Sequence, residues 1–287
     1  MATFYNQATL SYNGGVTNSN VTEGEVLAGL TLTKTAASRD YGPGDSITYV
    51  VTIVNAGDTE YTGLTVTDNL GAYTLPGGSV PLVPLTYIDG SVLYYQNGTP
   101  TAPPTVTAGD TLVISDISVP AGGNVTIIYE ARANEFAPLN AASSIFNTVV
   151  ANGGCVGEED LSDTSEVPTR DEASLTIAKA VCPEVINCGD AVTYTLIIQN
   201  TGNTATVATD DVVVRDVFNP ILTDISVTLN GEPLSEGAGY SYNETTGEFE
   251  TAAGAITVPA ATYERNPVTG AVTTTPGVAI ITVSGVV

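Results

Sequence analysis

The sequence contains no histidine and no tryptophan, and only seven of its 287 residues are lysine or arginine. Because histidine is the usual general base near neutral pH, its absence leads us to expect no conventional enzyme. No Ser-His-Asp, Cys-His or phosphate-binding glycine pattern occurs either. The net charge of −24 excludes a nucleic-acid surface, because phosphate contacts need basic side chains. It also argues against attraction to anionic membranes.

Long hydrophobic runs are missing as well. No apolar stretch approaches the ~18 residues of a membrane span, so no membrane insertion is expected. Residues Met1–Tyr5 have neither the basic start nor the apolar core of a signal peptide, and no anchor signal stands at Val287. An extracellular place on a cell or spore surface then requires that the chain has been processed already or leaves the cell by another route.

Acidic residues are abundant, with 31 Asp and Glu. Their simplest role is self-repulsion, which keeps an abundant protein soluble. The alternative is Ca²⁺ binding by carboxylate clusters such as Glu158-Glu159-Asp160 or Asp210-Asp211, although no EF-hand loop occurs. We expect no cofactor and keep calcium as the alternative.

Two tandem repeats run through the chain, as blocks of similar sequence recurring in the same order. The matched blocks are Leu30–Lys34 with Leu175–Lys179, Gly44–Tyr49 with Gly189–Tyr194, Asn55–Gly57 with Asn200–Gly202, Leu64–Asp68 with Val212–Asp216, Val119–Ala121 with Val258–Ala260, and Val125–Ile128 with Val278–Ile281.

Each repeat holds about seven short runs of two-residue alternation, separated by turn residues. This pattern predicts an all-β protein with two tandem Ig-like antiparallel β-sandwich domains. We expect a donor strand and linker over 1–29, domain 1 over 30–156, a linker over 157–174, and domain 2 over 175–287. The expected strands are 30–35, 46–54, 63–69, 91–96, 111–118, 124–131 and 144–151 in the first repeat, and 175–180, 191–199, 211–217, 225–229, 247–251, 255–258 and 278–286 in the second.

The second repeat stops at Val287, where a counterpart of 144–151 should begin, and a segment of that kind stands before the first repeat. Val26 follows Asn6 by twenty positions, and Val167 follows Asn147 by the same number. Alternation places one set of residues of this segment on a single face, as anchors of a donated strand. They are Phe4, Asn6, Ala8, Leu10 and Tyr12.

Donation to an identical subunit gives a head-to-tail contact that does not close, and hence a homopolymer. A chain that folded back onto its own second domain would need a sharp bend, because the linker after Tyr12 runs directly into the first repeat. The other alternative is a flexible tail. A domain left without its closing strand would expose a long bare edge, which native proteins avoid.

The only two lysines, Lys34 and Lys179, occupy equal positions in the repeats, and alternation directs both inward. A buried lysine tends to lose its proton and become a nucleophile, and a buried aspartic acid can shuttle protons. Each domain is expected to collect a Lys, an Asp and an Asn, which predicts a Lys–Asn isopeptide bond. The alternative is a buried ion pair with the Asn as hydrogen-bond partner. The sets are Lys34, Asp68 and Asn147 within one chain, and Lys179, Asp216 and the donated Asn6 between chains.

Cys182 and Cys188 flank the first turn of the second repeat and predict a disulfide in an oxidising compartment. Zinc is less favoured, since only two thiolates are local and no histidine exists. Cys155 is left over, as a free or intermolecular thiol.

A set of short motifs marks the first repeat. They are Lys34-Thr35, Gly42-Pro43-Gly44-Asp45, Thr48-Tyr49, Asn55 with Gly57, Val66-Thr67-Asp68 and Asn147-Thr148. On these motifs the repeat resembles a bacterial conserved-repeat surface-protein family of unknown function, whose Ig-like units occur in tandem on cell surfaces. The second copy departs from the pattern at Cys188, at Arg215 and in its missing final strand. The resemblance implies a surface or extracellular location.

Three functions remain open on the sequence. The first is a filament subunit, pilus-like or part of a spore or cell-surface appendage, that assembles by donating residues 4–12. The second is a monomeric surface adhesin or stalk module that binds a host or matrix ligand. The third is an acidic, calcium-dependent coat protein.

Overall fold

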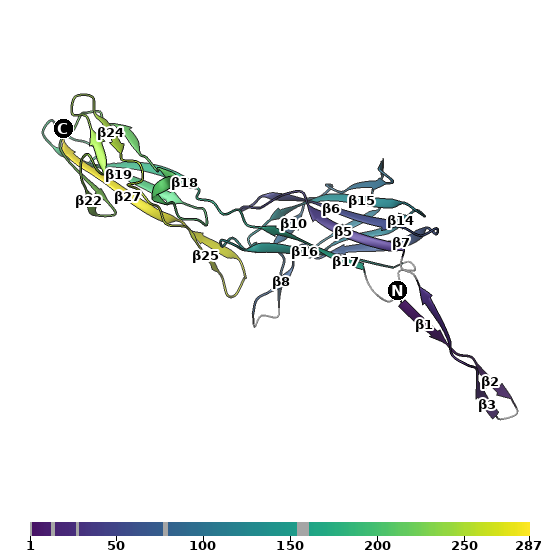
Figure 1. Cartoon of the computed structure of the whole chain (residues 1–287). Helices are drawn as coiled ribbons and strands as arrows, with labels where there is room; N and C mark the ends of the chain where they lie inside the picture. The colour runs from purple at the N-terminus through teal and green to yellow at the C-terminus, as the bar shows by residue number, and fades with distance from the viewer. Residues whose placement is uncertain (1, 13–14, 27–28, 77–79, 154–160) are drawn as a thin grey trace. The chain divides into compact units, whose positions relative to one another are not determined.

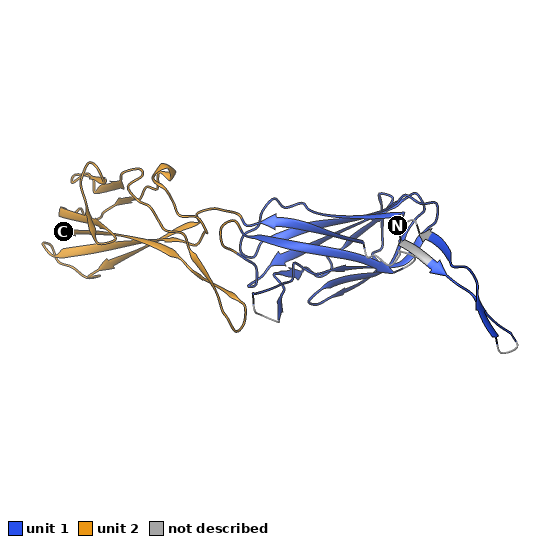
Figure 2. Ribbon diagram, turned by 60° about the horizontal axis from the view of Figure 1, so that its bottom comes forward, with its two compact units in different colours: residues 1–138, 143–169 blue, residues 139–142, 170–287 orange. Residues whose placement is uncertain are grey.

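The computed structural model describes residues 2–12, 15–26, 29–76, 80–153 and 161–287 (Figure 1). It divides into two compact units, one of residues 1–138 with 143–169 and the other of 139–142 with 170–287 (Figure 2). Both units are built from antiparallel strands, so the all-β prediction is confirmed. Among the described residues, no helix is long and apolar enough to cross a membrane.

Unit 1 is a sandwich of two sheets. One has the order β12-β11-β15-β6-β5, with β10 also paired to β15, and the other has the order β13-β14-β7-β16-β17. The bounds are β5 Leu30–Ala36, β6 Ser46–Asn55, β7 Tyr61–Asp68, β10 Leu85–Tyr87, β11 Leu93–Gln96, β12 Thr99–Thr101, β13 Thr105–Ala108, β14 Leu112–Val119, β15 Asn124–Ala133, β16 Ser144–Gly153 and β17 Leu161–Pro168, with a small ladder of β8 Tyr73–Thr74 and β9 Pro81–Leu82.

Alternation explains these strands. Along β6 every second residue is buried and the residues between are more exposed, and β15 repeats the pattern beside it. One apolar face per sheet therefore points into the sandwich and forms the core. The inward residues of these two strands are Ile47, Tyr49, Val51, Ile53, Val125, Ile127, Tyr129 and Ala131.

Strand β17 corrects the expected linker over 157–174. It pairs along its whole length with β16, and it continues to Thr169, which bridges Tyr41 in parallel. Its buried positions are Ser165, Val167 and Thr169. Because two of these three side chains are polar, the alternation of apolar residues that marks a strand is hidden here.

Unit 2 has a sheet of order β18-β19-β27-β21-β22 and a second sheet of order β20-β24-β23. A separate hairpin joins β25 to β26. The expected strand over 255–258 is wrong, because those residues follow a turn outside any strand. The bounds are β18 Leu175–Cys182, β19 Ala191–Asn200, the 3-10 turn η1 Ala208–Asp210, β20 Arg215–Val217, β21 Thr223–Leu229, β22 Glu232–Leu234, β23 Tyr240–Tyr242, β24 Glu248–Thr251, β25 Thr262–Arg265, β26 Val272–Thr275 and β27 Gly277–Val286.

Strand pairing relates the two units and corrects one sequence match. Tyr49 lies opposite Tyr129 in unit 1, and the equivalent Tyr194 lies opposite Val283 in unit 2. The expected match of Val125–Ile128 with Val278–Ile281 is therefore one residue out of register, since a one-residue slip would send every side chain to the other face.

The N-terminal arm, residues 2–26, forms two ladders instead of one strand over 4–12. Strand β1 Ala2–Asn6 pairs with β4 Thr22–Val26, and β2 Thr9–Tyr12 pairs with β3 Gly15–Asn18. Ala8 lies at the junction, where its N–H donates to Ser19 Oγ at 3.0 Å. In the described part of the chain, neither ladder pairs with a further strand.

Candidate functional site

Unit 1 shows what a complete repeat contains. In its second sheet β7 lies between β14 and β16, and β17 continues the sheet beyond β16. Strand β17 also contacts β5 of the other sheet. The N–H of Lys34 donates to Asp163 Oδ2 at 2.6 Å, and the N–H of Tyr41 donates to the carbonyl of Pro168 at 3.0 Å. Strand β17 thus covers the side of the sandwich beside β5.

Unit 2 leaves the corresponding side open. Strand β20 takes the place of β7 and β24 that of β14, because Asp216 lies opposite Phe249 as Asp68 lies opposite Leu112. Over the described residues, β20 pairs with β24 alone, and unit 2 has no counterpart of β16 or β17.

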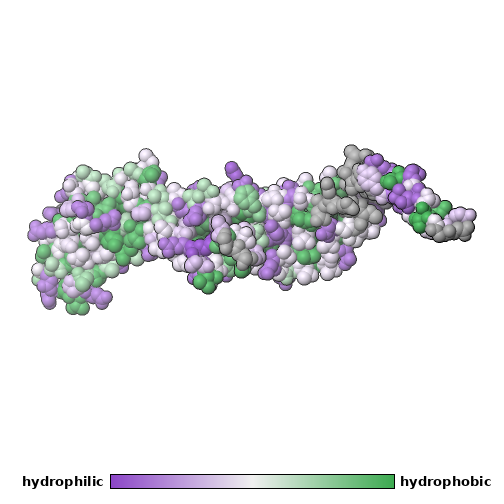
Figure 3. Space-filling model, turned by 90° about the horizontal axis from the view of Figure 1, so that it is seen from below, coloured by the Kyte–Doolittle hydropathy of each residue, from purple (hydrophilic) through white to green (hydrophobic). Residues whose placement is uncertain are grey.

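Strand β18, the counterpart of β5, is exposed along its whole length. In unit 1, Leu30 and Leu32 are only 4% and 9% exposed, whereas the equivalent Leu175 and Ile177 are 39% and 56% exposed. Figure 3 shows hydrophobic residues reaching the surface of unit 2 in several places. The open side of unit 2 is therefore an apolar strand beside an unpaired sheet edge.

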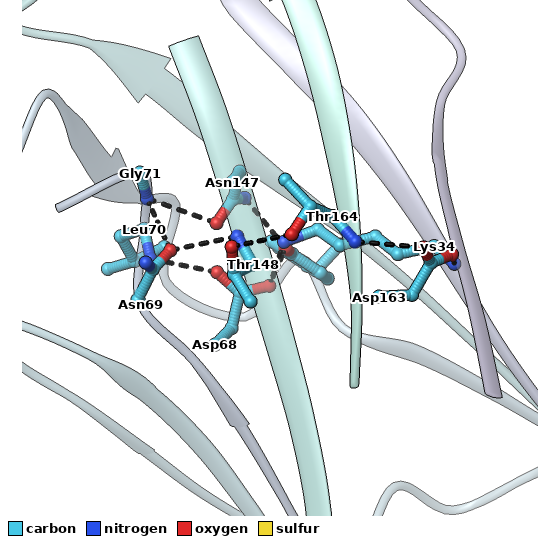
Figure 4. Close-up of polar contacts among 10 residues, drawn as sticks. Lys34, Asp68, Asn69, Leu70, Gly71, Asn147, Thr148, Asp163 and Thr164 are labelled. Carbon is cyan, nitrogen blue, oxygen red and sulfur yellow. Dashed lines mark hydrogen bonds and ion pairs between the residues drawn. The ribbon is translucent and has the colours of Figure 1, made fainter. Parts of the chain in front are cut away.

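A polar cluster lies inside unit 1, at the end of β7. Lys34 Nζ forms an ion pair with Asp68 Oδ2, and Tyr129 OH donates to the same oxygen. Asn147 Nδ2 donates to Tyr129 OH at 3.2 Å. Figure 4 shows Lys34, Asp68 and Asn147 together with the residues around them. The structure therefore brings together all three residues that the sequence predicted for this domain.

Backbone N–H groups fix the two acceptors of this cluster. Leu70 donates to Asp68 Oδ1 at 2.9 Å, and Gly71 donates to Asn147 Oδ1 at 3.0 Å. An N–H on the amide oxygen draws electrons from the amide carbon, which makes Asn147 a better electrophile.

Burial changes the acidity of the cluster. Lys34, Asp68 and Asn147 are at most 3% exposed. Burial lowers the pKa of Lys34 to about 8, against the opposing effect of the Asp68 charge. Burial also raises the pKa of Tyr129 well above its usual value. A neutral amine is therefore accessible at mildly alkaline pH, beside a side-chain amide.

Unit 2 has the counterpart of this cluster without the asparagine. Lys179 Nζ forms an ion pair with Asp216 Oδ2, but the Lys179 side chain is 40% exposed. It lies 4.6 Å from the centre of the Tyr194 ring, as Lys34 lies 4.8 Å from that of Tyr49. Asn6 is exposed and lies opposite Thr22 in the arm.

The other donor anchors are placed as follows. Leu10 and Tyr12 are exposed on β2, and Ala8 lies outside the strands. The side chain of Phe4 lies outside the part that the structure describes. Figure 3 also shows hydrophobic residues at the surface of the arm.

The expected disulfide is not formed, because Cys182 and Cys188 are both exposed free thiols. The turn between them is held by hydrogen bonds instead. The N–H of Asn187 donates to Asp190 Oδ2 at 2.7 Å, and the N–H of Gly189 donates to the carbonyl of Val287 at 2.7 Å. Cys155 lies outside the described residues.

Among the described residues, no group of three or more Asp, Glu, Cys or His side chains is placed to hold a metal ion. Asp210 accepts the N–H of Val207 at 2.8 Å and caps the η1 turn. The cluster Glu158-Glu159-Asp160 lies outside the described residues. Calcium binding remains an untested alternative.

The sequence did not reveal Tyr129, which hydrogen-bonds to Asp68 and Asn147, or Asp163, which accepts the N–H of Lys34. Tyr129 has no tyrosine counterpart in unit 2, so the comparison of repeats gave no signal for it. Asp163 fell in the expected linker. Tyr49 could have been found, because the pair Thr48-Tyr49 recurs as Thr193-Tyr194.

Comparisons with known proteins give matches only among solved structures. No protein-family model matches the chain, and no curated protein matches it. The resemblance to the conserved-repeat surface family therefore stays a prediction.

The structural matches include bacterial surface proteins and pilins, and also AvmM, which catalyses a macrocyclization in alchivemycin A biosynthesis. BcpA, the major pilin subunit of Bacillus cereus, is 11% identical with a TM-score of 0.35, over 96% of this chain and 73% of that one. The full-length major pilin SpaD of Corynebacterium diphtheriae is 14% identical with a TM-score of 0.37, over 64% of this chain and 56% of that one. The C-terminal domain of the Streptococcus agalactiae AgI/II polypeptide BspA is 13% identical with a TM-score of 0.31, over 89% and 91%. At such scores the likeness carries no argument about function.

Proposed function

We propose that this chain is a structural subunit of an extracellular bacterial filament, which assembles when the N-terminal segment of one copy enters the open side of unit 2 in the next. The observation that carries the proposal is the contrast between the two repeats. Unit 1 covers β5 and pairs both edges of β7, whereas in the described residues unit 2 exposes β18 and leaves one edge of β20 unpaired.

The energetics favour filling this side. An unpaired strand edge is a template for another strand, and full burial of an aliphatic side chain stabilises by ~1.5–3 kcal/mol. Ile177 on the acceptor and Leu10 on the arm are both more than half exposed. One donor and one acceptor per copy give a head-to-tail homopolymer.

A covalent bond between Lys34 and Asn147 is the second part of the proposal. The neutral Lys34 amine attacks the side-chain carbonyl carbon of Asn147, a bond from Nζ to Cγ forms, and the bond from Cγ to Nδ2 breaks. Asp68 takes a proton from the attacking nitrogen and returns one to the departing nitrogen, so ammonia leaves. No oxidant, metal or cofactor is needed.

The same reaction between Lys179 of one copy and Asn6 of the next would link the filament covalently. Asn6 occupies the position in its segment that Asn147 occupies in β16. Lys179 and Asp216 already form the ion pair that Lys34 and Asp68 form.

Deletion of residues 1–12 tests the assembly. We expect the full chain to form filaments in negative-stain micrographs and to sediment at increasing mass with concentration, while the truncated chain stays monomeric. Val268→Ser, which removes an exposed apolar side chain far from the arm in sequence, serves as the control and should assemble normally. Filaments of the truncated chain would contradict donation, and a full chain that stays monomeric at high concentration would favour an adhesin.

Intact mass under denaturing conditions tests the bonds. We expect Lys34→Met to restore the mass of one ammonia without removing the ladder of linked oligomers. Lys179→Met should remove the ladder and keep the loss of ammonia in unit 1. A native chain with no ammonia loss and no ladder rules out both bonds.

A further inference from the structure

We propose that the donated element includes the two-stranded ladder of β1 and β4, so that β1, continued by residues 8–12, takes the place of β16 in the next copy and β4 takes the place of β17. This inference rests on the proposed function and names the segment that fills the site. A single donated strand, as the sequence suggested, would use only residues 4–12.

The open side of unit 2 has room for two strands. In unit 1, residues 149–153 of β16 pair with β7. Strand β17 is the one that contacts β5, where the Asp163 side chain accepts the N–H of Lys34. A single strand at the place of β16 would therefore repair the edge of β20. It would leave β18 without the cover that β17 gives to β5.

The arm carries a second strand at the required spacing. When Asn6 is aligned with Asn147, residues 20–27 align with 161–168, the span of β17. Strand β4 occupies Thr22–Val26 within that span, and it already pairs with β1 antiparallel, as β17 pairs with β16. Figure 1 shows β1 and its partner strand as a two-stranded element.

The register of the two ladders differs by two positions. Asn147 lies opposite Ser165, whereas Asn6 lies opposite Thr22 and the alignment would place it opposite Gly24. A shift by two residues keeps every side chain on its own face, because alternation has a period of two. Seating of the arm therefore needs a slide of β4 along β1 and no reversal of its faces. Residues 8–12 align with residues 149–153 of β16, which pair with β7, so β2 must also separate from β3 to pair with β20.

The seated ladder would restore the contacts seen in unit 1. Thr22 aligns with Asp163 and would bring a hydroxyl oxygen to the N–H of Lys179, where Asp163 accepts the N–H of Lys34 at 2.6 Å. Ile177 on β18 would become covered, as Leu32 is on β5.

Amide hydrogen exchange on the full chain, before and after assembly, tests this inference. We expect amides of β1, β4 and β18 all to exchange at least about tenfold more slowly in the assembled state. Filaments in which β1 is protected while β4 and β18 exchange as before would overturn the two-stranded donor and leave the proposed function intact. A protein that protects its arm but stays monomeric would show that the arm folds back onto its own unit 2. A protein that shows neither filaments nor protection would overturn both proposals.

Proline substitution gives a second test with a matched control. Glu23 lies within β4, and alanine at this position keeps the strand N–H that proline removes. We therefore expect Glu23→Pro to slow filament growth at least about tenfold and Glu23→Ala to leave it unchanged. Equal growth of Glu23→Pro and the native chain would show that β4 takes no part.

Discussion

Lys34 and Lys179 occupy the same position in two related units, but they differ in how far their side chains are exposed to solvent. Burial lowers the pKa of Lys34, while the side chain of Lys179 is 40% exposed. Removal from water is what makes a lysine amine a neutral nucleophile. Reaction at Lys179 therefore requires the arm that would bury it, which restricts the bond between copies to assembled chains.

The pKa of Lys34 predicts how stability changes with pH. The folded pKa of about 8 lies below the usual lysine value of 10.5. Between these values the unfolded chain binds more protons, so the free energy of unfolding rises with pH. We expect Asn147→Ala, which cannot form the bond, to gain up to ~3 kcal/mol between pH 8 and about 10. Denaturant unfolding over a pH series measures the gain.

The native chain supplies the comparison. When Lys34 is part of an amide bond its nitrogen no longer titrates, so the rise in the free energy of unfolding with pH should vanish. The double variant Lys34→Met, Asn147→Ala should likewise show none. A native chain that gains as much as Asn147→Ala would contradict the bond. Above pH ~10 stability should fall in every variant, because burial raises the pKa of Tyr49 and Tyr129, and the unfolded chain then loses their protons first.

Tyr129 joins Asp68 to Asn147, and its hydroxyl predicts a stability effect. Tyr129→Phe removes the hydrogen bonds that join its hydroxyl to Asp68 and Asn147 in the core. We expect a loss of ~1–3 kcal/mol in the unfolding of unit 1, measured by chemical denaturation. Tyr95→Phe, at a partly exposed position of β11, should change stability by less than ~0.5 kcal/mol. Equal losses would show that the hydroxyl of Tyr129 has no special role.

At the scale of elements, β5 and β18 are equivalent strands of the two units. Leu32 is 9% exposed and Ile177 is 56% exposed at the equivalent position. We expect Leu32→Ala to destabilise unit 1 by ~2–5 kcal/mol. Ile177→Ala should cost the unassembled chain less than ~1 kcal/mol but raise the concentration needed for assembly, as sedimentation would show. If Ile177→Ala assembles as well as the native chain, β18 is not covered in the filament.

The same scale shows what the sequence could predict. Strands such as β6 and β15 were predictable, because burial on one face imposes strict alternation. Strand β17 could not be predicted in this way. The buried residues Ser165 and Thr169 are polar, so the segment shows no alternation of apolar and polar residues. The break of the arm at Ala8 was also missed, since it depends on pairing with Ser19 and not on the pattern of residues 4–12.

The candidate site was predictable in part. Lys34, Asp68 and Asn147 could be named because inward polar residues interrupt apolar faces at repeated positions. Their partner Tyr129 could not, because an inward tyrosine on an apolar face looks like any other core residue.

At the scale of the whole molecule, charge opposes association. Each copy has a net charge of −24, and the screening length falls from about 30 Å at 0.01 M salt to about 8 Å at 0.15 M. We expect added sodium chloride to lower the concentration at which filaments appear, measured by light scattering.

Two controls accompany this experiment. Potassium chloride at equal ionic strength should act alike, and a calcium chelator should change nothing. Assembly that weakens with salt would point to ion pairs as the driving contact, and assembly abolished by the chelator would favour the calcium-dependent coat protein.

The unequal ends of this chain give any filament a direction. Because each copy presents one arm and one open sheet, a linear array of any length keeps a single unused arm at one tip and a single unfilled sheet at the other. The two tips are thus chemically distinct. A molecule that anchors the array needs to match only one of them, and a terminator with an arm-like hairpin but no acceptor sheet would cap growth at the tip with the unfilled sheet.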